Sequence, residues 1–145
     1  MIAPMSAPRE VVVRGAANGF AQVVEVDGLH LIADEPKEFG GSGTGPTPYD
    51  LLLAALGTCT SMTVGLYARK QGWPLENVTV RLSHERVHET DCEECIEHPR
   101  RLDRITIQLE LAGALTDQQR DKLRQIAAHC PVHKTLTSNI SIQMK

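Results

Sequence analysis

Aromatic residues are scarce in this sequence: one Trp, two Tyr and two Phe make up 3% of 145 residues. The core must therefore be built from Val, Leu, Ile and Ala, and the chain lacks aromatic platforms on which nucleic-acid bases could stack. Basic blocks are also missing, since 15 Lys and Arg stand against 18 Asp and Glu, for a net charge of -3. A chain without a basic block cannot neutralise a run of phosphates, so we expect no nucleic-acid partner.

The segment from Met1 to Arg9 lacks the basic start and uninterrupted apolar run of a secretory signal, which predicts a cytoplasmic protein. Four cysteines are too few for a disulfide-stapled scaffold, so they are reactive thiols, metal ligands or inert core residues. The stretch from Leu51 to Ala68 is nearly uncharged, but Gly, Thr and Ser dilute it and no basic loop flanks it. We expect no membrane span and no cofactor.

Short strands separated by turn dipeptides open the chain. The expected strands cover residues 11–13, 20–26 and 29–33, and the turns are Asn18-Gly19 and Asp27-Gly28. This pattern predicts an antiparallel meander of three strands. The next segment, Glu35 to Pro46, contains four glycines and has no periodicity, which predicts a flexible loop.

A long apolar helix follows this loop. Thr47 as N-cap, Pro48 at the first helical position and Asp50 in the first turn predict a helix that runs to about residue 71. Its low charge indicates burial on all sides. Small residues recur every four positions at Gly57, Ser61 and Gly65. This stripe lets another backbone approach closely, either the helix of a second copy in a dimer or the sheet of the same chain.

The second half of the chain predicts a hairpin, two helices and a last strand. Residues 78–82 and 105–111 alternate as paired half-buried strands, residues 116–129 and 132–138 are helical, and residues 140–144 form the final strand. His84, Arg86 and His88 continue the apolar parity of the first hairpin strand, which places polar groups on the inner face unless a bulge shifts the register. We expect one domain, 1–145.

Two cysteines stand in contrasting positions. Cys130 directly precedes Pro131, near the N-cap of the last helical segment, where unpaired N–H groups favour a thiolate and lower a thiol pKa. Cys59 lies within the apolar helix, where desolvation raises the pKa of a thiol and makes it inert without further help.

The sequences around these cysteines resemble a known family. Residues 45–62, GPTPYDLLLAALGTCTSM, and residues 127–133, AAHCPVH, look like the two cysteine motifs of the OsmC/Ohr family of osmotically inducible and organic hydroperoxide resistance proteins. The resemblance implies an α+β, OsmC-like fold, with antiparallel sheets wrapped around two long central helices in an intertwined homodimer.

The resemblance also implies a mechanism. The Cys59 thiolate attacks the O–O bond of an organic hydroperoxide and becomes a sulfenic acid, which Cys130 resolves to a disulfide. A dithiol reductant, lipoyl-linked in some relatives, then reduces the disulfide. The alternative is a non-catalytic dimer that binds a small apolar ligand or a metal beside Cys59. Acyl transfer by Cys130 with His129 or His133 is disfavoured, because adjacent residues rarely reach each other's reactive atoms.

The chain departs from the family at the thiol-activating pair. Tyr49 stands where the well-known peroxidases carry a glutamate, and residues 16–19 stand where its arginine partner is expected, with Arg14 the nearest guanidinium. Because Arg86 and His84 lie on the inward parity of their strand, we hypothesise that one of them supplies the positive charge.

A second cluster gathers His and Cys residues within a charged loop. His88, Cys92, Cys95 and His98 are the expected ligands of any four-ligand metal site, and Cys92-Glu-Glu-Cys95 has the spacing of a zinc or redox pair. The alternatives of a metal site, a reversible Cys92–Cys95 disulfide and a plain polar loop all remain open at this point.

Overall fold

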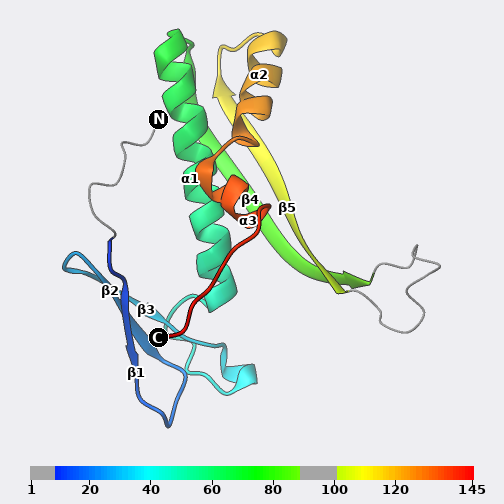
Figure 1. Ribbon diagram of the computed structural model, residues 1–145. Helices are drawn as coiled ribbons and strands as arrows, with labels where there is room; N and C mark the ends of the chain where they lie inside the picture. Colours follow the sequence, from blue (N-terminus) through cyan, green and yellow to red (C-terminus); the bar gives the residue numbers. More distant parts are fainter. Residues whose placement is uncertain (1–8, 89–100) are drawn as a thin grey trace. The chain divides into compact units, whose positions relative to one another are not determined.

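The computed structural model describes residues 9–88 and 101–145. The chain forms two compact units, Met1–Leu51 and Leu52–Lys145, which are described separately. The first unit holds strands β1 to β3, and the second holds most of helix α1, strands β4 and β5, and helices α2 and α3 (Figure 1). The expectation of a single domain, 1–145, stays a prediction.

The first unit is a three-stranded antiparallel sheet in the order β1-β2-β3, which confirms the predicted meander. Its strands are β1 (Val12–Gly15), β2 (Gln22–Val26) and β3 (Leu29–Ala33). Asp27 and Gly28 form the tight turn between β2 and β3, with positive φ angles of 49° and 78°. Two consecutive positive φ angles match the twist of a two-residue hairpin, which explains why Asp-Gly is found there.

The first hairpin differs from the prediction, because β2 begins at Gln22 rather than at Phe20. Gly15 pairs with Gln22, so the connection spans residues 16–21 and is longer than a two-residue Asn18-Gly19 turn. The side-chain amide of Gln22 donates to the carbonyl of Phe20 at 3.2 Å, and this bond holds Phe20 outside the strand ladder.

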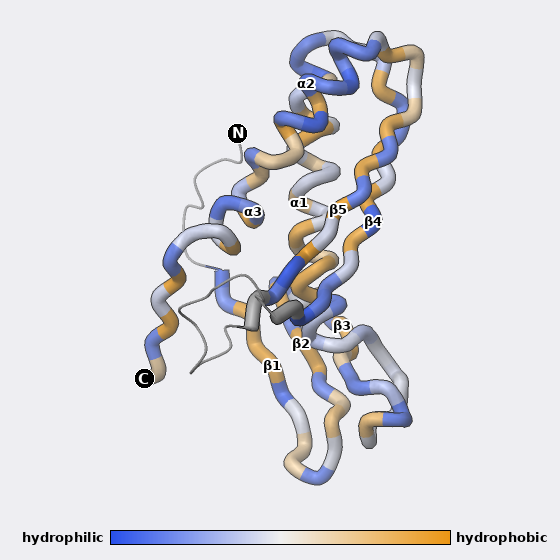
Figure 2. Tube along the Cα trace, turned by 90° about the vertical axis from the view of Figure 1, so that its right-hand side faces the viewer, coloured by the Kyte–Doolittle hydropathy of each residue, from blue (hydrophilic) through white to orange (hydrophobic). Residues whose placement is uncertain are grey.

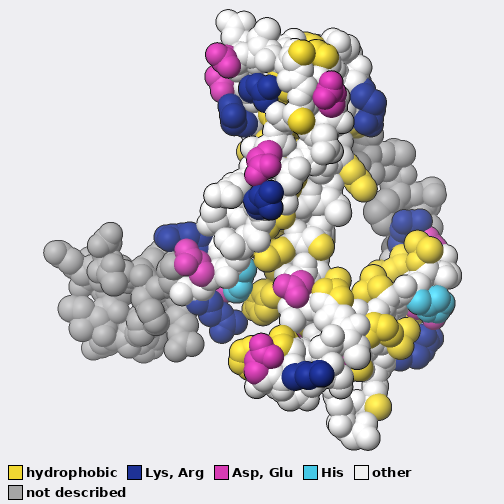
Figure 3. Space-filling model, turned by 180° about the vertical axis from the view of Figure 1, so that it is seen from behind, with side chains coloured by type: hydrophobic (Ala, Val, Ile, Leu, Met, Phe, Trp, Pro, Cys, Tyr) yellow, Lys and Arg dark blue, Asp and Glu magenta, His cyan; other side chains and the backbone are white. Residues whose placement is uncertain are grey.

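Hydrophobic side chains are exposed on this small sheet (Figure 3). They include Val13, Val23, Leu29, Leu31 and Ile32. Val13, Leu29 and Leu31 lie on one face of the sheet and Val23 and Ile32 on the other, so both faces expose apolar side chains.

The loop after β3 is organised around one buried carboxylate, which the sequence did not reveal. Asp34 accepts hydrogen bonds from the backbone N–H groups of Glu35, Ser42 and Thr44 and from the Thr44 hydroxyl, at 2.6–3.2 Å. The Thr44 hydroxyl is the main cause that holds the pKa of Asp34 below its usual value, against the opposing effect of desolvation. The predicted flexible loop is therefore a defined structure, which includes a short 3-10 helix at Lys37–Phe39.

Helix α1 (Pro48–Gln71) begins where the sequence predicts. The Thr47 hydroxyl accepts from the Asp50 N–H at 3.2 Å, and the Asp50 carboxylate accepts from the Thr47 N–H at 2.9 Å. This reciprocal pair satisfies donors that the first helical turn leaves open. By length and composition alone α1 is apolar enough to cross a membrane, although a third of its most apolar stretch is already buried within the chain.

Burial on all sides of α1 was a wrong expectation for the single chain, since one face is buried and the opposite face is exposed. The buried positions are Leu56, Gly57, Cys59, Thr60, Val64 and Ala68. The sequence left open whether the small-residue stripe faces a second copy or the sheet of the same chain. At Gly57 it faces the chain's own sheet, because a Cβ there would lie 2.7 Å from Leu82 Cδ1 of β4.

Strands β4 (Leu75–His88) and β5 (Arg101–Gly113) form a long antiparallel hairpin. The register is continuous from the pair Asn77–Ala112 to the pair His88–Arg101, and the only irregularity within the paired, described positions lies between Leu75 and Asn77. No bulge therefore separates Leu82 from His84, and the partly buried His84 continues the inward parity, whereas the Arg86 side chain is exposed.

Helices α1 and α2 (Asp117–Ala127) cover the same face of this hairpin (Figures 1 and 2). Their contact is a core of Val64, Ala68 and Leu123, packed against apolar residues of both strands. Thr116 caps α2 with a reciprocal pair of bonds to Gln119, and Cys130 caps the short helix α3 (Pro131–Leu136), as expected from the sequence.

The predicted last strand, residues 140–144, is absent from this part of the described chain, which has no regular structure after α3. Polar and apolar residues alternate there (Figure 2), yet Ile142 and Met144 are 84% and 94% exposed. A strand needs a partner for its backbone groups, and the two described sheets pair only β1 to β3 and β4 with β5. Residues 140–144 have no such partner in the described chain, so the alternating pattern alone does not make them a strand.

The close approach at Gly57 leads to a prediction about stability. We expect Gly57→Ala to lower the free energy of unfolding by about 1–2 kcal/mol, because the clash with Leu82 outweighs the better helix propensity of alanine. In a Leu82→Ala background the same change should cost nothing or stabilise by up to about 1 kcal/mol, as measured by urea denaturation. An equal loss in both backgrounds would contradict this contact.

Candidate active site

Cys59 and Cys130, which are 71 positions apart in the sequence, meet in one apolar cluster of the second unit. Leu56 completes the buried centre of this cluster. Five partly buried apolar residues surround it: Leu82, Ile105, Ile107, Val132 and Leu136. Both cysteines are free and buried, with exposed fractions of 9% and 0%. Because every one of these residues belongs to one chain, the meeting of the two thiols does not require a second subunit.

Cys130 is held at the start of α3 by its own chemistry. Its backbone is extended, Pro131 occupies the first helical position, and the backbone N–H of His133 donates to Cys130 Sγ at 3.3 Å. Thr60 Oγ1 lies 3.6 Å from the same sulfur and also donates to the Leu56 carbonyl at 2.8 Å. Since its single proton goes to that carbonyl, Thr60 accepts from the Cys130 S–H in the reduced protein.

Burial raises the pKa of the Cys59 thiol, as expected for this position. The neighbouring Cys130 acts in the same direction, whereas the backbone N–H of Val132 and the hydroxyl of Thr63 favour the thiolate. Desolvation is the largest of these effects, so the thiol form dominates at neutral pH. Catalysis at Cys59 therefore requires a group that removes its proton.

The two cations that were expected to assist Cys59 gather around a carboxylate. His84 Nε2 lies 2.8 Å and Arg86 Nε 3.4 Å from Asp103 Oδ1. The bond with His84, followed by the charges of Arg86 and His84, keeps the pKa of Asp103 below its usual value against desolvation. Direct assistance of Cys59 by either cation stays a prediction, as does the role of Tyr49, which lies in the other unit.

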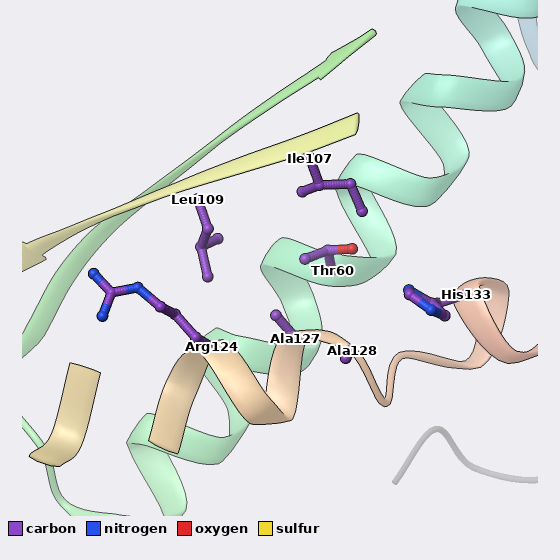
Figure 4. Close-up of a pocket in the computed structure, with 7 residues that line it drawn as sticks. All are labelled: Thr60, Ile107, Leu109, Arg124, Ala127, Ala128 and His133. Atoms are coloured by element: carbon purple, nitrogen blue, oxygen red, sulfur yellow. The ribbon is translucent and has the colours of Figure 1, made fainter. Parts of the chain in front are cut away.

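Two cavities lie beside the cysteine pair. The larger, about 360 Å³, is lined by Thr60, Ile107, Leu109, Arg124, Ala127, Ala128 and His133 (Figure 4). The smaller, about 200 Å³, is lined by Leu56, Asp103, Ile105, Ile107, His133, Leu136 and Thr137. Their walls are mostly apolar, with a few polar groups, which is the usual make-up of small-molecule sites.

Sequence reasoning singled out both cysteines as candidates but missed the groups that contact them. Thr60 and Thr63 looked like residues that only dilute an apolar helix, yet Thr63, one turn after Cys59, bonds its sulfur, and Thr60 Oγ1 lies 3.6 Å from Cys130 Sγ. No sequence pattern indicated that the Val132 N–H bonds the Cys59 sulfur, because this contact depends on how α3 packs against α1.

The predicted second cluster cannot be placed. Cys92, Cys95 and His98 lie outside the described residues, and the side chain of His88 is not described either. Within residues 9–88 and 101–145, no group of three His, Cys, Asp or Glu side chains is arranged to hold a metal ion.

Comparison with known proteins identifies the family of this chain. The model of the OsmC-like protein family matches residues 41–145. The chain belongs to this family. A search of curated proteins finds no match.

Solved structures of OsmC-like proteins share the α+β fold of antiparallel sheets and helices. The OsmC-like protein of Mycoplasma pneumoniae is 18% identical, with 91% of this chain and 89% of that chain covered and a TM-score of 0.69. The organic hydroperoxide resistance protein OsmC of Legionella pneumophila is 21% identical, with coverages of 94% and 93% and a TM-score of 0.64. The organic hydroperoxide resistance protein OhrB of Bacillus subtilis is 17% identical, with coverages of 92% and 93% and a TM-score of 0.63.

The burial of Cys59 predicts slow alkylation at neutral pH. We expect its reaction with iodoacetamide, followed by mass spectrometry, to rise with pH through a midpoint above the ordinary thiol value of about 8.5. Because the folded state holds this proton more tightly, the stabilisation is present below the ordinary pKa and is lost as pH rises through the folded pKa. Cys59→Ser should therefore reduce the loss of stability at alkaline pH. A Cys59 midpoint below 8 would contradict the desolvation.

Proposed function

We propose that this protein is a cytoplasmic thiol peroxidase that reduces organic hydroperoxides, with Cys59 as the nucleophile and Cys130 as the resolving cysteine. The observation that carries the proposal is the contact of two free thiols in one apolar cluster whose residues also line two cavities. The membership of the OsmC-like family and the organic hydroperoxide resistance proteins among its structural neighbours support it.

The proposed cycle has three steps. The Cys59 thiolate attacks one oxygen of the hydroperoxide, the O–O bond breaks, and Cys59 sulfenic acid and an alcohol form. The Cys130 thiol displaces the hydroxyl of the sulfenic acid, which leaves as water, and a Cys59–Cys130 disulfide forms. A dithiol, lipoyl-linked by analogy with relatives, reduces this disulfide to two thiols and is itself oxidised to a disulfide.

The apolar surroundings support the choice of substrate. Leu56, Ile105 and Ile107 offer favourable contacts to the organic group of an alkyl or aryl hydroperoxide. Hydrogen peroxide has no such group and must leave its hydration shell to enter. We therefore expect a preference for organic hydroperoxides over hydrogen peroxide.

Thiol titration with cumene hydroperoxide tests the cycle. Of the four cysteines, two should be lost per chain in the wild-type protein and none in Cys59→Ser, whereas Cys130→Ser should stop at a sulfenic acid that dimedone traps. Cys92→Ser serves as the matched control and should keep the loss of Cys59 and Cys130. Absence of thiol loss in the wild type would defeat the proposal and favour a non-catalytic ligand-binding dimer.

We further propose that the protein is a homodimer, with the sheets of two copies wrapped around paired α1 helices. The exposed apolar residues of the β1–β3 sheet and the exposed face of α1, including Leu52 and Met62, provide surface for a partner. The unpaired alternation of residues 140–144 supports a strand that forms only on association.

A pair of substitutions in this segment tests the association. Ile142→Asp places a charge in the apolar row of the proposed strand and should weaken dimerisation at least about tenfold, measured by sedimentation at several concentrations. Ser141→Asp is the matched control on the opposite row and should leave the dimer intact. A monomeric wild-type protein, or equal effects of the two changes, would overturn this assembly.

A further inference from the structure

The two cavities beside the cysteines lie end to end along β5. Asp103, Ile105 and Ile107 line the smaller one, and Ile107 and Leu109 line the larger one. On α1 the smaller cavity touches Leu56 and the larger touches Thr60, which lies one turn further along the helix. Neither cysteine lines either of these two cavities, but the cluster that contains both thiols shares Leu56, Ile105, Ile107 and Leu136 with the cavity walls.

One titratable residue lines both spaces. Among the described residues that line the two cavities, only Ile107 and His133 are shared, and of these His133 alone can carry a proton. Its imidazole points from α3 into the larger cavity (Figure 4). The ring therefore lies where it can contact a ligand bound in either cavity.

The backbone of His133 is fixed against the sulfur of Cys130. Its N–H donates to Cys130 Sγ at 3.3 Å, and its carbonyl accepts from the backbone N–H and the hydroxyl of Thr137 at 3.1 and 2.9 Å. Three bonds hold this residue in the first turn of α3. A residue fixed in this way presents its side chain to the cavities at little entropic cost.

Other charged groups at the cavities are less suited to proton transfer at neutral pH. Asp103 of β5 lies at the far end of the smaller cavity and contacts His84 and Arg86. Arg124 of α2 lines the larger cavity, contacts Asp121 and stays protonated in proteins. Among the described residues, Cys130 is the titratable group that contacts the His133 N–H. An imidazole, by contrast, can exchange a proton at neutral pH.

We propose that His133 is a further catalytic residue, the acid and base of the thiol reaction. This inference rests on the proposed function. The neutral imidazole takes the proton of the Cys59 thiol, and the thiolate attacks the hydroperoxide bound in the cavity. The O–O bond breaks, two electrons pass from sulfur to peroxide, and the departing alkoxide takes the proton from the imidazolium and leaves as the alcohol. His133 ends neutral, ready for another turnover.

His133→Gln tests the proposal against a histidine control. The rate constant of Cys59 oxidation by cumene hydroperoxide should fall about 100-fold, and the step that the wild-type rate shows between about pH 5 and 8 should disappear. His129→Gln removes an exposed imidazole that bonds the Gln125 carbonyl, and this control should keep the step.

A second variant separates chemistry from structure. His133→Ala opens space at the junction of the cavities, and added imidazole should restore its rate, whereas His133→Gln should not respond. At long reaction times both variants should still lose two thiols per chain, because only the proton transfer is slowed. A wild-type rate without the step, a His133→Gln protein with an unchanged rate and profile, or a His133→Ala protein without rescue would overturn the role of His133. A wild-type protein that loses no thiols would instead overturn the proposed function.

Discussion

The close packing of one face of α1 on the β4–β5 hairpin determines where the two buried thiols lie. At Gly57 the helix approaches Leu82 so closely that a Cβ would lie 2.7 Å from Leu82 Cδ1, and the leucine side chain would have to shift. Cys59 and Thr60 follow two and three positions later on α1. Both pack between the hairpin and α3, where Cys130 lies. Apolar burial against the hairpin stabilises the helix and, through the same contact, removes the thiol from water.

That burial has opposite effects on stability and on reactivity. Apolar packing stabilises the helix, but the same desolvation keeps the Cys59 thiol protonated, which opposes the proposed role of Cys59 as nucleophile. In the proposed mechanism, a proton acceptor that lines both cavities removes this proton. Cys130 meets the same constraint differently, because the first turn of α3 offers it a backbone N–H.

Local signals predicted the starts of α1 and α2 and the turn between β2 and β3. Thr47 and Thr116 cap helices because each side chain satisfies backbone donors within a few residues, and Asp27-Gly28 turns because its φ angles are set locally. The errors arose where distant groups decide. Asp34 orders its loop through donors up to ten residues away, and residues 140–144 need a strand that the described chain does not provide.

The sequence by itself determined the starts of α1 and α2, the alternation of β4 and β5 and the family, and it singled out the two cysteines as candidates, because these are carried by short motifs and by the periods of 3.6 and 2 residues. Only the tertiary structure decided that Cys59 and Cys130 touch, that Thr60 and the His133 N–H hold the second sulfur, and that His133 lines both cavities. Such contacts join residues about 70 positions apart, and their geometry depends on how helix and hairpin surfaces pack, which no local pattern encodes.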